Sequence, residues 1–331
     1  MRVGVAGANG FMGAEAARLL LSHPHFELTL VSAGESAGKK LRDVRPGLDT
    51  DLVLQPTDPS LFERHCDAVI LALPHGASAP IAEDLIKRGR VVLDLGSDFR
   101  IKDPDESSRW YGRQAPRRRL LEEAWYGLPE LTGPPPEGSR LIANPGCFAT
   151  ALCLGLAPLA GQPIEKVRAS GITGSSGSGA APSPGVHHST RATNFVPYKP
   201  LEHQHLGEVF QLLTEKGASF DVDFVPHSAP LTRGIFLTLF VDLPEETLLK
   251  LYTTAFEGSS MIKVSQGPVP LGAVTGTNRT LIGISGSGPV SVVFVALDNL
   301  LKGGSGQGIQ NLNLLFGRPE SEGLPLHAMW P

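Results

Sequence analysis

The fold is decided by the segment RVGVAGANGFMGAEAARLLLSH at residues 2–23. It begins with RVGVA, a short and largely apolar run of β-forming residues, and it ends with AEAARLLLSH, whose spacing suits a helix. Between the two lies a G-x-x-G-x-x-G pattern formed by Gly7, Gly10 and Gly13. Glycines at such a turn let the backbone bend tightly and approach a pyrophosphate, which then meets the N-terminus of the helix. The segment therefore predicts the first strand, loop and helix of a dinucleotide-binding domain, the alternative being a glycine-rich turn without a ligand.

The alternation of strands and helices continues after this segment. Apolar runs at 27–33 (ELTLVSA), 67–74 (DAVILALP) and 90–96 (RVVLDLG) suit strands, and the last two are continuous, as in strands buried on both faces of a sheet. APIAEDLIKRG at 79–89 suits a helix that ends at a glycine. This order predicts an α/β domain of the Rossmann type with a parallel sheet. The charged and proline-rich residues 101–140 are expected to form a long surface excursion.

The second half of the chain has a different pattern. Helices are expected at 205–217 and 244–256, and strands at 166–173, 222–231, 233–243 and within 280–300. Strands and helices do not alternate strictly here, so we expect an α+β domain with a mainly antiparallel sheet.

The composition limits the class of protein. A chain of 331 residues suits two domains, and a net charge of -4 gives no electrostatic footprint for nucleic acid. No apolar stretch approaches the roughly 20 residues that span a bilayer, and the opening MRVGVAGANG lacks a cleavable signal. The three cysteines cannot all pair and have no metal-type spacing. We therefore expect a cytoplasmic protein with neither a membrane nor a nucleic-acid partner, in a reducing compartment.

The end of the second predicted strand bears on the choice of cofactor. A cofactor without a 2′-phosphate usually meets an acidic residue at this point. Here the strand closes on Val31 and Ser32, and Lys39 and Lys40 lie nearby. The pattern favours NADP over NAD, although Glu35 leaves NAD open.

Cys147 is the candidate nucleophile. It follows the turn Asn-Pro-Gly at 144–146 and begins a probable helix, whose free amides and dipole favour a thiolate and can stabilise an oxyanion. A cysteine in this position can equally be a small buried hydrophobic residue, and the position alone leaves both open. Cys66 and Cys153 are expected to pack in the core.

A nucleophilic thiol needs a base, and YKPLEHQHLGEV supplies His203 and His205, with Glu208 placed to orient the latter. H-x-H can also be half of a metal site, but its spacing matches no accepted zinc pattern, so no metal is expected. Arg100 and Arg233 each follow a strand-like segment and suit planar capture of phosphate or carboxylate, unless they are surface cations.

A set of segments in order along the chain resembles one known family: GANGFMGAE, LALPHG, DLGSDFR, YGLPEL, NPGCFAT, SGITG, YKPLEHQHLGEV, PLTRGI and DNLLKGGSGQGIQN. They are similar to N-acetyl-gamma-glutamyl-phosphate reductase of arginine biosynthesis. The resemblance implies an NADP-dependent oxidoreductase. In that reaction Cys147 attacks an acyl phosphate, phosphate leaves, and the thioester is reduced to a semialdehyde. His205 is implied as the acid/base, with His203 as its neighbour.

The resemblance also implies the remaining site and the domains. The nucleotide domain would be discontinuous, at 1–147 and 301–331, and the catalytic and dimerisation domain would be 148–300. A homo-oligomer, either a dimer or a tetramer, is expected. Substrate binding is implied for Arg100, Asn144, Gly174, Ser175 and Arg233. Cofactor binding is implied for Gly7, Asn9, Gly10, Phe11, Met12, Gly13, Ser32, Pro74, His75, Gly76, Ser97, Asn299, Lys302, Gly303 and Gln307.

The chain departs from the family in one loop, SGITGSSGSGAAPSPGVHHSTRA, which lacks the arginine of the usual SGxSGAGR. Whether Arg191 replaces it is open. A related branch, which reduces an aminoadipate phosphate carried on a small acidic protein in lysine biosynthesis, resembles this chain in the HH..RA part. That substrate, or a dual substrate, is the alternative. More distant alternatives are aspartate-semialdehyde dehydrogenase, glyceraldehyde-phosphate dehydrogenase, whose Cys-Thr-Thr-Asn signature is absent, and a non-catalytic NADPH-binding redox sensor.

Overall fold

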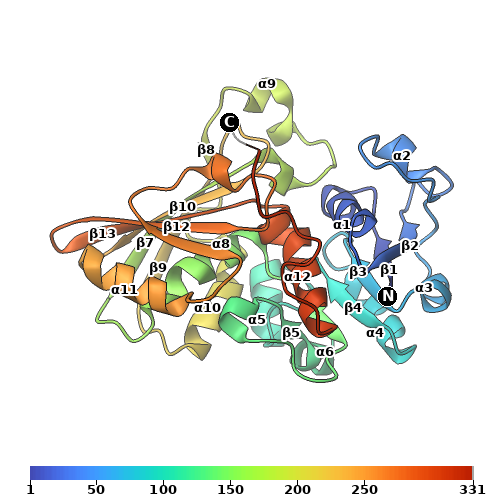
Figure 1. The fold of residues 1–331 in the computed structure, drawn as a ribbon, viewed down its shortest axis with the longest axis horizontal. Coiled ribbons are helices and arrows are strands. Elements are labelled where there is room, and N and C mark those ends of the chain that lie inside the picture. Colours follow the sequence, from blue (N-terminus) through green and yellow to red (C-terminus); the bar gives the residue numbers. More distant parts are fainter. Residues whose placement is uncertain (330–331) are drawn as a thin grey trace. The chain divides into compact units, whose positions relative to one another are not determined.

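The computed structural model describes residues 1–329, and the chain divides into two compact units. The first unit comprises Met1–Gly146 and Gly304–Leu324, and the second comprises Cys147–Gly303 and the segment that begins at Pro325 (Figure 1). The sequence analysis placed all of 301–331 in the first domain. The structure instead attaches the end of the described chain to the second unit, where the Asn278 N–H donates to the Pro325 carbonyl at 2.8 Å. Residues 330–331 lie outside the described part.

The first unit contains a sheet of parallel strands in the order β2-β1-β3-β4-β6-β5. This confirms the Rossmann-type α/β fold expected from the alternation of strands and helices. Its strands are β1 (Arg2–Ala6), β2 (Glu27–Ser32), β3 (Ala68–Leu71), β4 (Val91–Asp94), β5 (Trp125–Tyr126) and β6 (Leu141–Ala143). Its helices are α1 (Phe11–Leu21), α2 (Leu41–Val44), α3 (Pro59–His65), α4 (Ser78–Lys87), α5 (Pro104–Tyr111), α6 (Arg118–Glu123), α7 (Pro129–Thr132) and α12 (Gly306–Leu315).

The charged segment 101–140 is more structured than a surface excursion. It forms α5, α6 and the edge strand β5, whose Trp125 pairs with Ile142 of β6. The run of arginines faces solvent at the start of α6, whereas Leu120 and Leu121, next along the same helix, are buried. The expectation was wrong because two apolar residues in a charged run are enough to dock one short helix.

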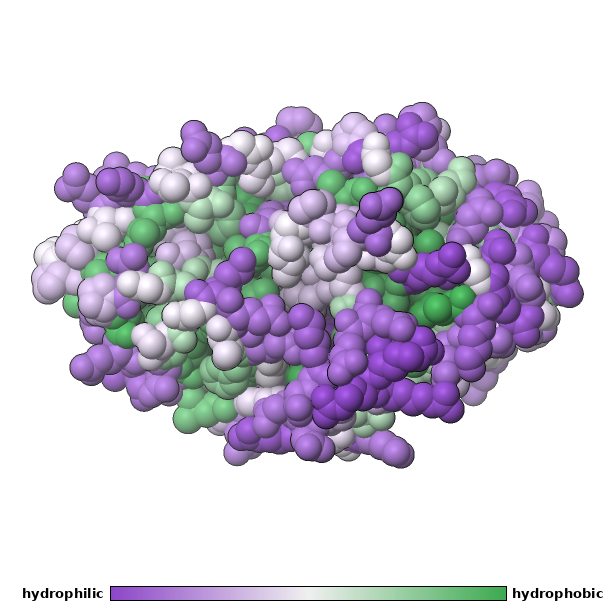
Figure 2. All heavy atoms as spheres, turned by 90° about the horizontal axis from the view of Figure 1, so that it is seen from below, coloured by the Kyte–Doolittle hydropathy of each residue, from purple (hydrophilic) through white to green (hydrophobic). Residues whose placement is uncertain are grey.

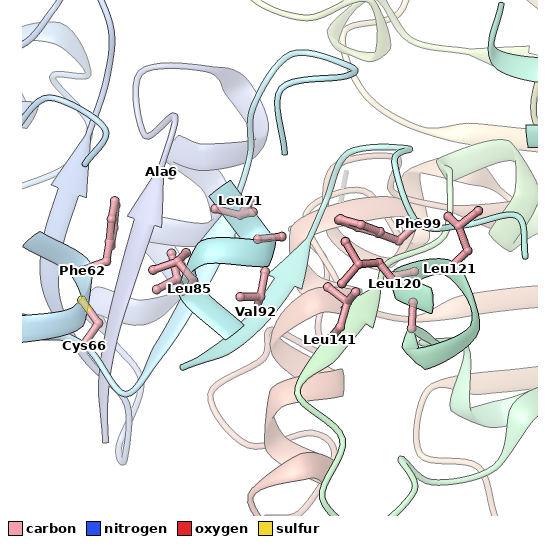
Figure 3. Packing of buried hydrophobic residues seen from close by; sticks show 14 of the residues in the cluster. Ala6, Phe62, Cys66, Leu71, Leu85, Val92, Phe99, Leu120, Leu121 and Leu141 are labelled. Atoms are coloured by element: carbon pink, nitrogen blue, oxygen red, sulfur yellow. The ribbon is translucent and has the colours of Figure 1, made fainter. Parts of the chain in front are cut away.

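The core of the first unit packs the helices against the apolar strands. Figure 3 shows part of this cluster, in which Leu71 and Val92 of the sheet lie with Phe62 of α3 and Leu85 of α4. Cys66 belongs to the same cluster and is fully buried, and burial raises the pKa of its thiol. This confirms Cys66 as a packing residue.

The second unit contains a seven-stranded sheet in the order β11-β12-β13-β10-β7-β9-β8. Four of its six pairings are antiparallel and two are parallel, which confirms the expected mainly antiparallel α+β unit. Its strands are β7 (Lys166–Thr173), β8 (Val196–Pro197), β9 (Asp221–Ser228), β10 (Ile235–Val241), β11 (Ile262–Gln266), β12 (Thr280–Ser287) and β13 (Val290–Leu297). Its helices are α8 (Cys147–Leu156), α9 (His188–Arg191), α10 (Leu206–Glu215) and α11 (Glu245–Ala255).

Helix α8 is the central helix of the second unit. All of its residues after Cys147 are buried, and it contacts α10, β10 and β13. A helix that is apolar on every side is stable only when surrounded in this way. Cys153 is fully buried within it, which confirms a packing role. Only the first residue of the helix is left partly exposed.

Within residues 1–329, no helix combines the length and apolar character that crossing a bilayer requires. The face drawn in Figure 2 is mostly hydrophilic, with hydrophobic residues interspersed.

Candidate active site

The glycine loop of the first unit has the shape of a phosphate cradle. Gly7 has φ +81°, and a Cβ there would lie 2.3 Å from the Ala72 carbonyl oxygen. A Cβ at Gly13 would lie 2.2 Å from the Gly7 carbonyl oxygen. Only glycine allows the backbone to come this close, which brings the loop against the start of α1. Gly10 is the N-cap of this helix and has no side chain that could occupy the free backbone amides. The residues present therefore fit a dinucleotide pyrophosphate.

One cation reaches this loop, and the sequence analysis did not single it out. The Arg45 guanidinium donates to the Asn9 carbonyl and lies over the Phe11 ring, 5.8 Å from its centroid. Lys40, one of the two lysines noted near the end of the second strand as favouring NADP, pairs with Asp51 at 2.7 Å. Arg45 lies in the loop that follows α2 and has no motif around it, so no sequence pattern could have identified it.

Two other predicted cofactor residues have internal partners in the first unit. The Ser32 hydroxyl is buried and lies 2.8 Å from the Thr57 hydroxyl. The Met12 carbonyl accepts from the Ser305 hydroxyl at 2.7 Å. Ser32 also accepts the N–H groups of Gly7 and Ala8 on its carbonyl, each at 3.0 Å. Strand β2 therefore supports the glycine loop through its backbone.

The turn Pro74-His75-Gly76 and Ser97, which the resemblance implies for cofactor binding, lie next to each other. The His75 Nδ1 lies 2.8 Å from the Ser97 hydroxyl, and the Gly76 N–H donates to Asp98 at 2.8 Å. Arg113, which had not been singled out, donates to both Ser97 and Asp98, at 2.7 and 2.8 Å. The two turns are thus held together by one guanidinium.

Two buried carboxylates lie beside these turns. Asp98 caps the start of α4, where it accepts the N–H groups of Ser78 and Ala79 at 3.1 and 3.0 Å. Asp94, the last residue of β4, is fully buried and accepts the Gly96 N–H at 2.9 Å. Burial and then the negative charge of Asp98 raise the pKa of Asp94 to about 6.

The turn that precedes Cys147 is held from several directions. The Asn144 side chain is buried and donates to the Gly304 carbonyl at 3.1 Å, while its oxygen accepts from Asn311 at 3.1 Å. Arg100 is also buried and donates to the Asn144 and Leu95 carbonyls at 2.7 and 2.9 Å. These contacts give Arg100 and Asn144 backbone partners in the first unit, and their contact with a substrate stays a prediction.

Gln307 of α12 is buried in the first unit and donates to Asn311 at 3.0 Å. Its Oε1 is buried without a hydrogen-bond partner in the described residues. A buried carbonyl oxygen of this kind fits a ligand that donates hydrogen bonds.

Cys147 is the first residue of α8 and is partly exposed, unlike the other two cysteines. Gly303 lies directly against it, since a Cβ on Gly303 would be 2.9 Å from the Cys147 Cβ. Lys302 is fully buried in the same unit. The surroundings leave room beside the sulfur-bearing carbon only because residue 303 is glycine.

The two predicted histidines lie together and differ in character. Their ring centroids are 4.7 Å apart, and the His203 Nδ1 accepts the His205 N–H at 3.2 Å. Burial, with the charge of His205 as the next cause, lowers the pKa of His203 to about 2. His203 is therefore neutral and carries its proton on Nε2, while His205 stands at the N-terminus of α10.

Tyr198 belongs to the same cluster, although the sequence analysis did not single it out. Its ring lies edge-on to His203 at 5.8 Å. Burial raises the pKa of Tyr198, with the charge of Cys147 as the next cause and that of Arg191 opposing it. Between Tyr198 and the histidines, Lys199 and Leu201 have φ of 42° and 63°. Left-handed backbone in bulky residues is uncommon and concentrates at functional sites.

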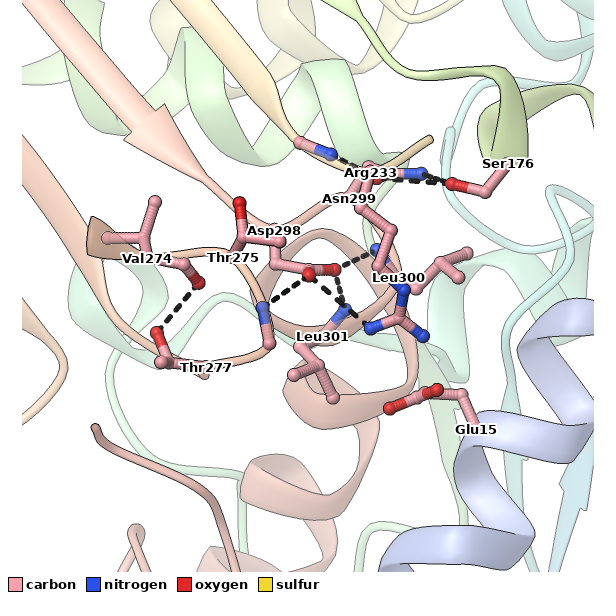
Figure 4. A network of polar contacts seen from close by, with 12 residues as sticks. Glu15, Ser176, Arg233, Val274, Thr275, Thr277, Asp298, Asn299, Leu300 and Leu301 are labelled. Carbon is pink, nitrogen blue, oxygen red and sulfur yellow. Dashed lines mark hydrogen bonds and ion pairs between the residues drawn. The ribbon is translucent and has the colours of Figure 1, made fainter. Parts of the chain in front are cut away.

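Asp298 joins several loops of the second unit (Figure 4). It is fully buried and accepts the N–H groups of Leu300 and Leu301 at 2.8 and 3.0 Å, the Gly276 N–H at 2.8 Å, and the Arg233 guanidinium at 3.4 Å. Arg233 therefore has a carboxylate partner. Asp298 begins the segment DNLLKGGSGQGIQN, but the sequence analysis did not single it out.

The adjacent Asn299 holds the loop predicted for substrate. Its Oδ1 accepts the Gly234 N–H at 2.7 Å, and its Nδ2 donates to the Ser176 hydroxyl at 3.0 Å. Gly174 and Ser175 donate to the Gly234 and Leu231 carbonyls at 3.0 and 2.8 Å. Within residues 1–329, no group of three or more His, Cys, Asp or Glu side chains is placed to hold a metal.

Comparison with known proteins defines the class. The models of the semialdehyde dehydrogenase NAD binding domain and dimerisation domain match residues 2–135 and 147–299. The fold is similar to that of aspartate semialdehyde dehydrogenase II complexed with ASA from Vibrio cholerae, with a TM-score of 0.71 and 19% identity over 96% of this chain and 98% of that chain. It is also similar to aspartate semialdehyde dehydrogenase with NADP from Candida albicans, with a TM-score of 0.66 and 19% identity over 95% and 98%. The fold and the two matching domain models are thus those of a semialdehyde dehydrogenase.

Full-length relatives narrow the class. The chain is 40% identical to N-acetyl-gamma-glutamyl-phosphate reductase of Methanopyrus kandleri over 97% of each chain, and 37% identical to the enzyme of that name from Bacillus subtilis over 100% of each. It belongs to the N-acetyl-gamma-glutamyl-phosphate reductase family. This confirms the resemblance stated from the sequence, the assignment as an oxidoreductase and the nicotinamide dinucleotide cofactor. The dimerisation domain supports a homo-oligomer.

Proposed function

We propose that this chain reduces N-acetyl-gamma-glutamyl phosphate to N-acetylglutamate semialdehyde and phosphate with NADPH, through a thioester on Cys147. The observation that carries the proposal is the position of Cys147 as the first and only partly exposed residue of an otherwise buried helix. The amides at a helix start stabilise a thiolate and the oxyanion that forms when it attacks a carbonyl. The names of the full-length relatives supply the substrate.

The residues have distinct tasks in this proposal. His205 takes the proton of the Cys147 thiol, whose sulfur bonds to the acyl carbon while the bond from that carbon to the phosphate oxygen breaks. The departing phosphate receives the proton from His205. NADPH, when bound, supplies the hydride that reduces the thioester. The carbon–sulfur bond then breaks, which releases the semialdehyde and returns Cys147 as a thiolate.

We assign the cofactor to the first unit and the substrate to the second. The loop of Gly7 and Gly13 would hold the pyrophosphate, and the absence of a carboxylate at the end of β2 together with Arg45 supports NADP over NAD. The Gly174-Ser175 turn and Arg233 are proposed to face the substrate. Arg100 and Asn144 support the turn before Cys147.

The test runs the reaction backwards with enzyme, NADP⁺, phosphate and N-acetylglutamate semialdehyde, and follows the formation of NADPH. We expect turnover by the wild type and a loss of at least about 10³-fold in Cys147→Ser, with unchanged NADP⁺ binding. Cys153→Ser is the matched control, because that thiol is buried in the same helix, and it should remain active. An active Cys147→Ser variant would rule out the thioester.

The same assay decides between the substrates. Free and carrier-bound aminoadipate semialdehydes serve as comparators, since the segment that holds His187, His188 and Arg191 motivates that alternative. We expect N-acetylglutamate semialdehyde to have the higher kcat/KM. A preference for the carrier-bound compound would show that the chain catalyses the reaction of lysine biosynthesis instead, with the small acidic carrier protein as its partner.

A further inference from the structure

Among the described residues of the second unit, one buried guanidinium has no carboxylate partner. Arg191 is the last residue of α9, and it is 9% exposed. Its Nη2 donates to the Thr173 carbonyl at 3.2 Å. Its Nε is buried and has no hydrogen-bond partner among residues 1–329. The titratable group whose charge acts on it is the Tyr198 hydroxyl, which is neutral at ordinary pH.

Such an arrangement opposes folding, because a buried charge without a counter-ion loses its hydration and gains little in return. The burial lowers the pKa of Arg191, in line with this. Two half-buried arginines do have carboxylate partners: Arg113 pairs with Asp98 at 2.8 Å and Arg233 with Asp298 at 3.4 Å. A guanidinium with donors to spare is complementary to a planar oxyanion such as a carboxylate or phosphate.

The position of Arg191 connects it to the site of Cys147. Thr173, to which it donates, is the last residue of β7 and immediately precedes the Gly174-Ser175 turn. Tyr198 lies near enough to both Cys147 and Arg191 for each to act on it. We propose that Arg191 is the receptor for an oxyanion of the substrate, either its carboxylate or its phosphoryl group. This inference rests on the function proposed above and names a specificity-determining residue for it.

A purely structural role is disfavoured by the contacts of Thr173. Its carbonyl also accepts the Ala229 N–H at 3.2 Å, so it stays bonded when the guanidinium is removed. Replacing Arg191 by methionine would therefore remove a buried charge without leaving a buried acceptor unpaired. We expect Arg191→Met to fold with an unchanged or higher Tm while it loses function.

The experiment measures KM for each substrate of the reverse reaction in Arg191→Met and Arg191→Lys. The matched control is Arg168→Met, which removes an exposed arginine from β7, the strand that ends at Thr173. We expect Arg191→Met to raise one KM by about tenfold to a hundredfold, and Arg191→Lys to raise it less. A change in the KM for the semialdehyde identifies the carboxylate as the ligand, and a change in the KM for phosphate identifies the phosphoryl group. The KM for NADP⁺ and the control variant should not change.

A binding measurement keeps this inference separate from the proposed function. N-acetylglutamate and inorganic phosphate are titrated into the wild type and Arg191→Met, with heat or Tm as the readout and no turnover needed. If the wild type binds either probe and Arg191→Met does not, Arg191 is an oxyanion receptor even where the proposed reaction fails. If both proteins bind the probes equally, or if the variant loses Tm and kcat with unchanged KM values, the inference is wrong and Arg191 is structural.

Discussion

At the scale of single residues, the burial of His203 decides whether this histidine can exchange protons. His203 is neutral at any pH at which the protein works, because its folded pKa is about 2. We therefore expect His203→Asn to lower the rate while the pH midpoints of kcat/KM stay where they are in the wild type. An asparagine oxygen can still accept the His205 N–H that His203 Nδ1 accepts at 3.2 Å. If the pH profile of kcat/KM lost its rising or falling limb in His203→Asn, His203 would instead be the acid/base.

The matched variant is His205→Asn, which should lose most of the turnover and keep NADP⁺ binding, since His205 belongs to the second unit and the glycine loop to the first. Equal losses of rate and cofactor affinity would point to a structural role for His205.

How far single residues could be predicted depends on local pattern. Cys147 was identified because a sharp turn followed by small apolar residues marks a helix start, which the structure has at that residue. Tyr198, Arg45 and Asp298 were missed because the contacts that mark them are with residues far along the chain, which are Cys147, Asn9 and Arg233 respectively. Long-range contacts of this kind leave no spacing in the sequence.

At the scale of elements, the strand–loop–helix of residues 2–21 makes a prediction about its glycines. Gly13→Ala would place a Cβ 2.2 Å from the Gly7 carbonyl oxygen, so the loop or α1 must shift. We expect the free energy of unfolding to fall by about 1–3 kcal/mol, which lowers the Tm, and we expect NADP⁺ to bind more weakly. Thermal unfolding and cofactor titration measure the two effects.

Gly10→Ala is the control for that prediction. Its Cβ would meet only the Gly7 oxygen at 3.5 Å, an ordinary contact, and its φ of -78° suits alanine. The Tm should be unchanged, whereas cofactor binding should weaken if the pyrophosphate approaches this backbone. A Tm for Gly13→Ala equal to that of Gly10→Ala would contradict the packing argument.

Elements with strong periodicity were predicted well, and those formed by docking were not. The expected strand at 166–173 is β7 to the residue, because its apolar residues alternate along one buried face. Strand β5 has two residues, too few to carry any period, and it exists because the edge of β6 is there to pair with it. The fold class thus followed from pattern, whereas the sheet edge depended on tertiary contacts.

At the scale of the whole molecule, the crossings between the two units involve few residues. The chain passes from the first unit to the second at Gly146 and Cys147 and returns at Gly303 and Gly304. In the second unit Gly303 lies against Cys147, and in the first Asn144 donates to Gly304 at 3.1 Å. In each unit, therefore, the residue at which the chain enters lies close to the residue at which it leaves. The proposed nucleophile, Cys147, is itself one of these residues.

The stability of the whole chain should depend on pH through Asp94. In the unfolded chain an aspartate loses its proton near pH 3.9, whereas folded Asp94 has a pKa of about 6. Between these values the folded state binds the extra proton, so this contribution to stability falls as the pH rises through that window. Above pH 6 the folded protein carries a constant penalty of at most about 3 kcal/mol from this group.

Asp94→Asn should therefore raise the Tm by several degrees at pH 8, and the gain should shrink as the pH falls from 6 to 4, because the amide resembles the protonated acid. The Asn Oδ1 can still accept the Gly96 N–H that Asp94 accepts at 2.9 Å. Asp67 is the control, because hydrogen bonding to Arg2 lowers its pKa and its charged form therefore stabilises the fold. Asp67→Asn should lose stability at neutral pH, the opposite of the effect expected for Asp94→Asn. Melting curves of both variants and the wild type from pH 4 to 8 measure this. A gain for Asp94→Asn that is the same at pH 4 and pH 8 would show that packing, not titration, is its cause.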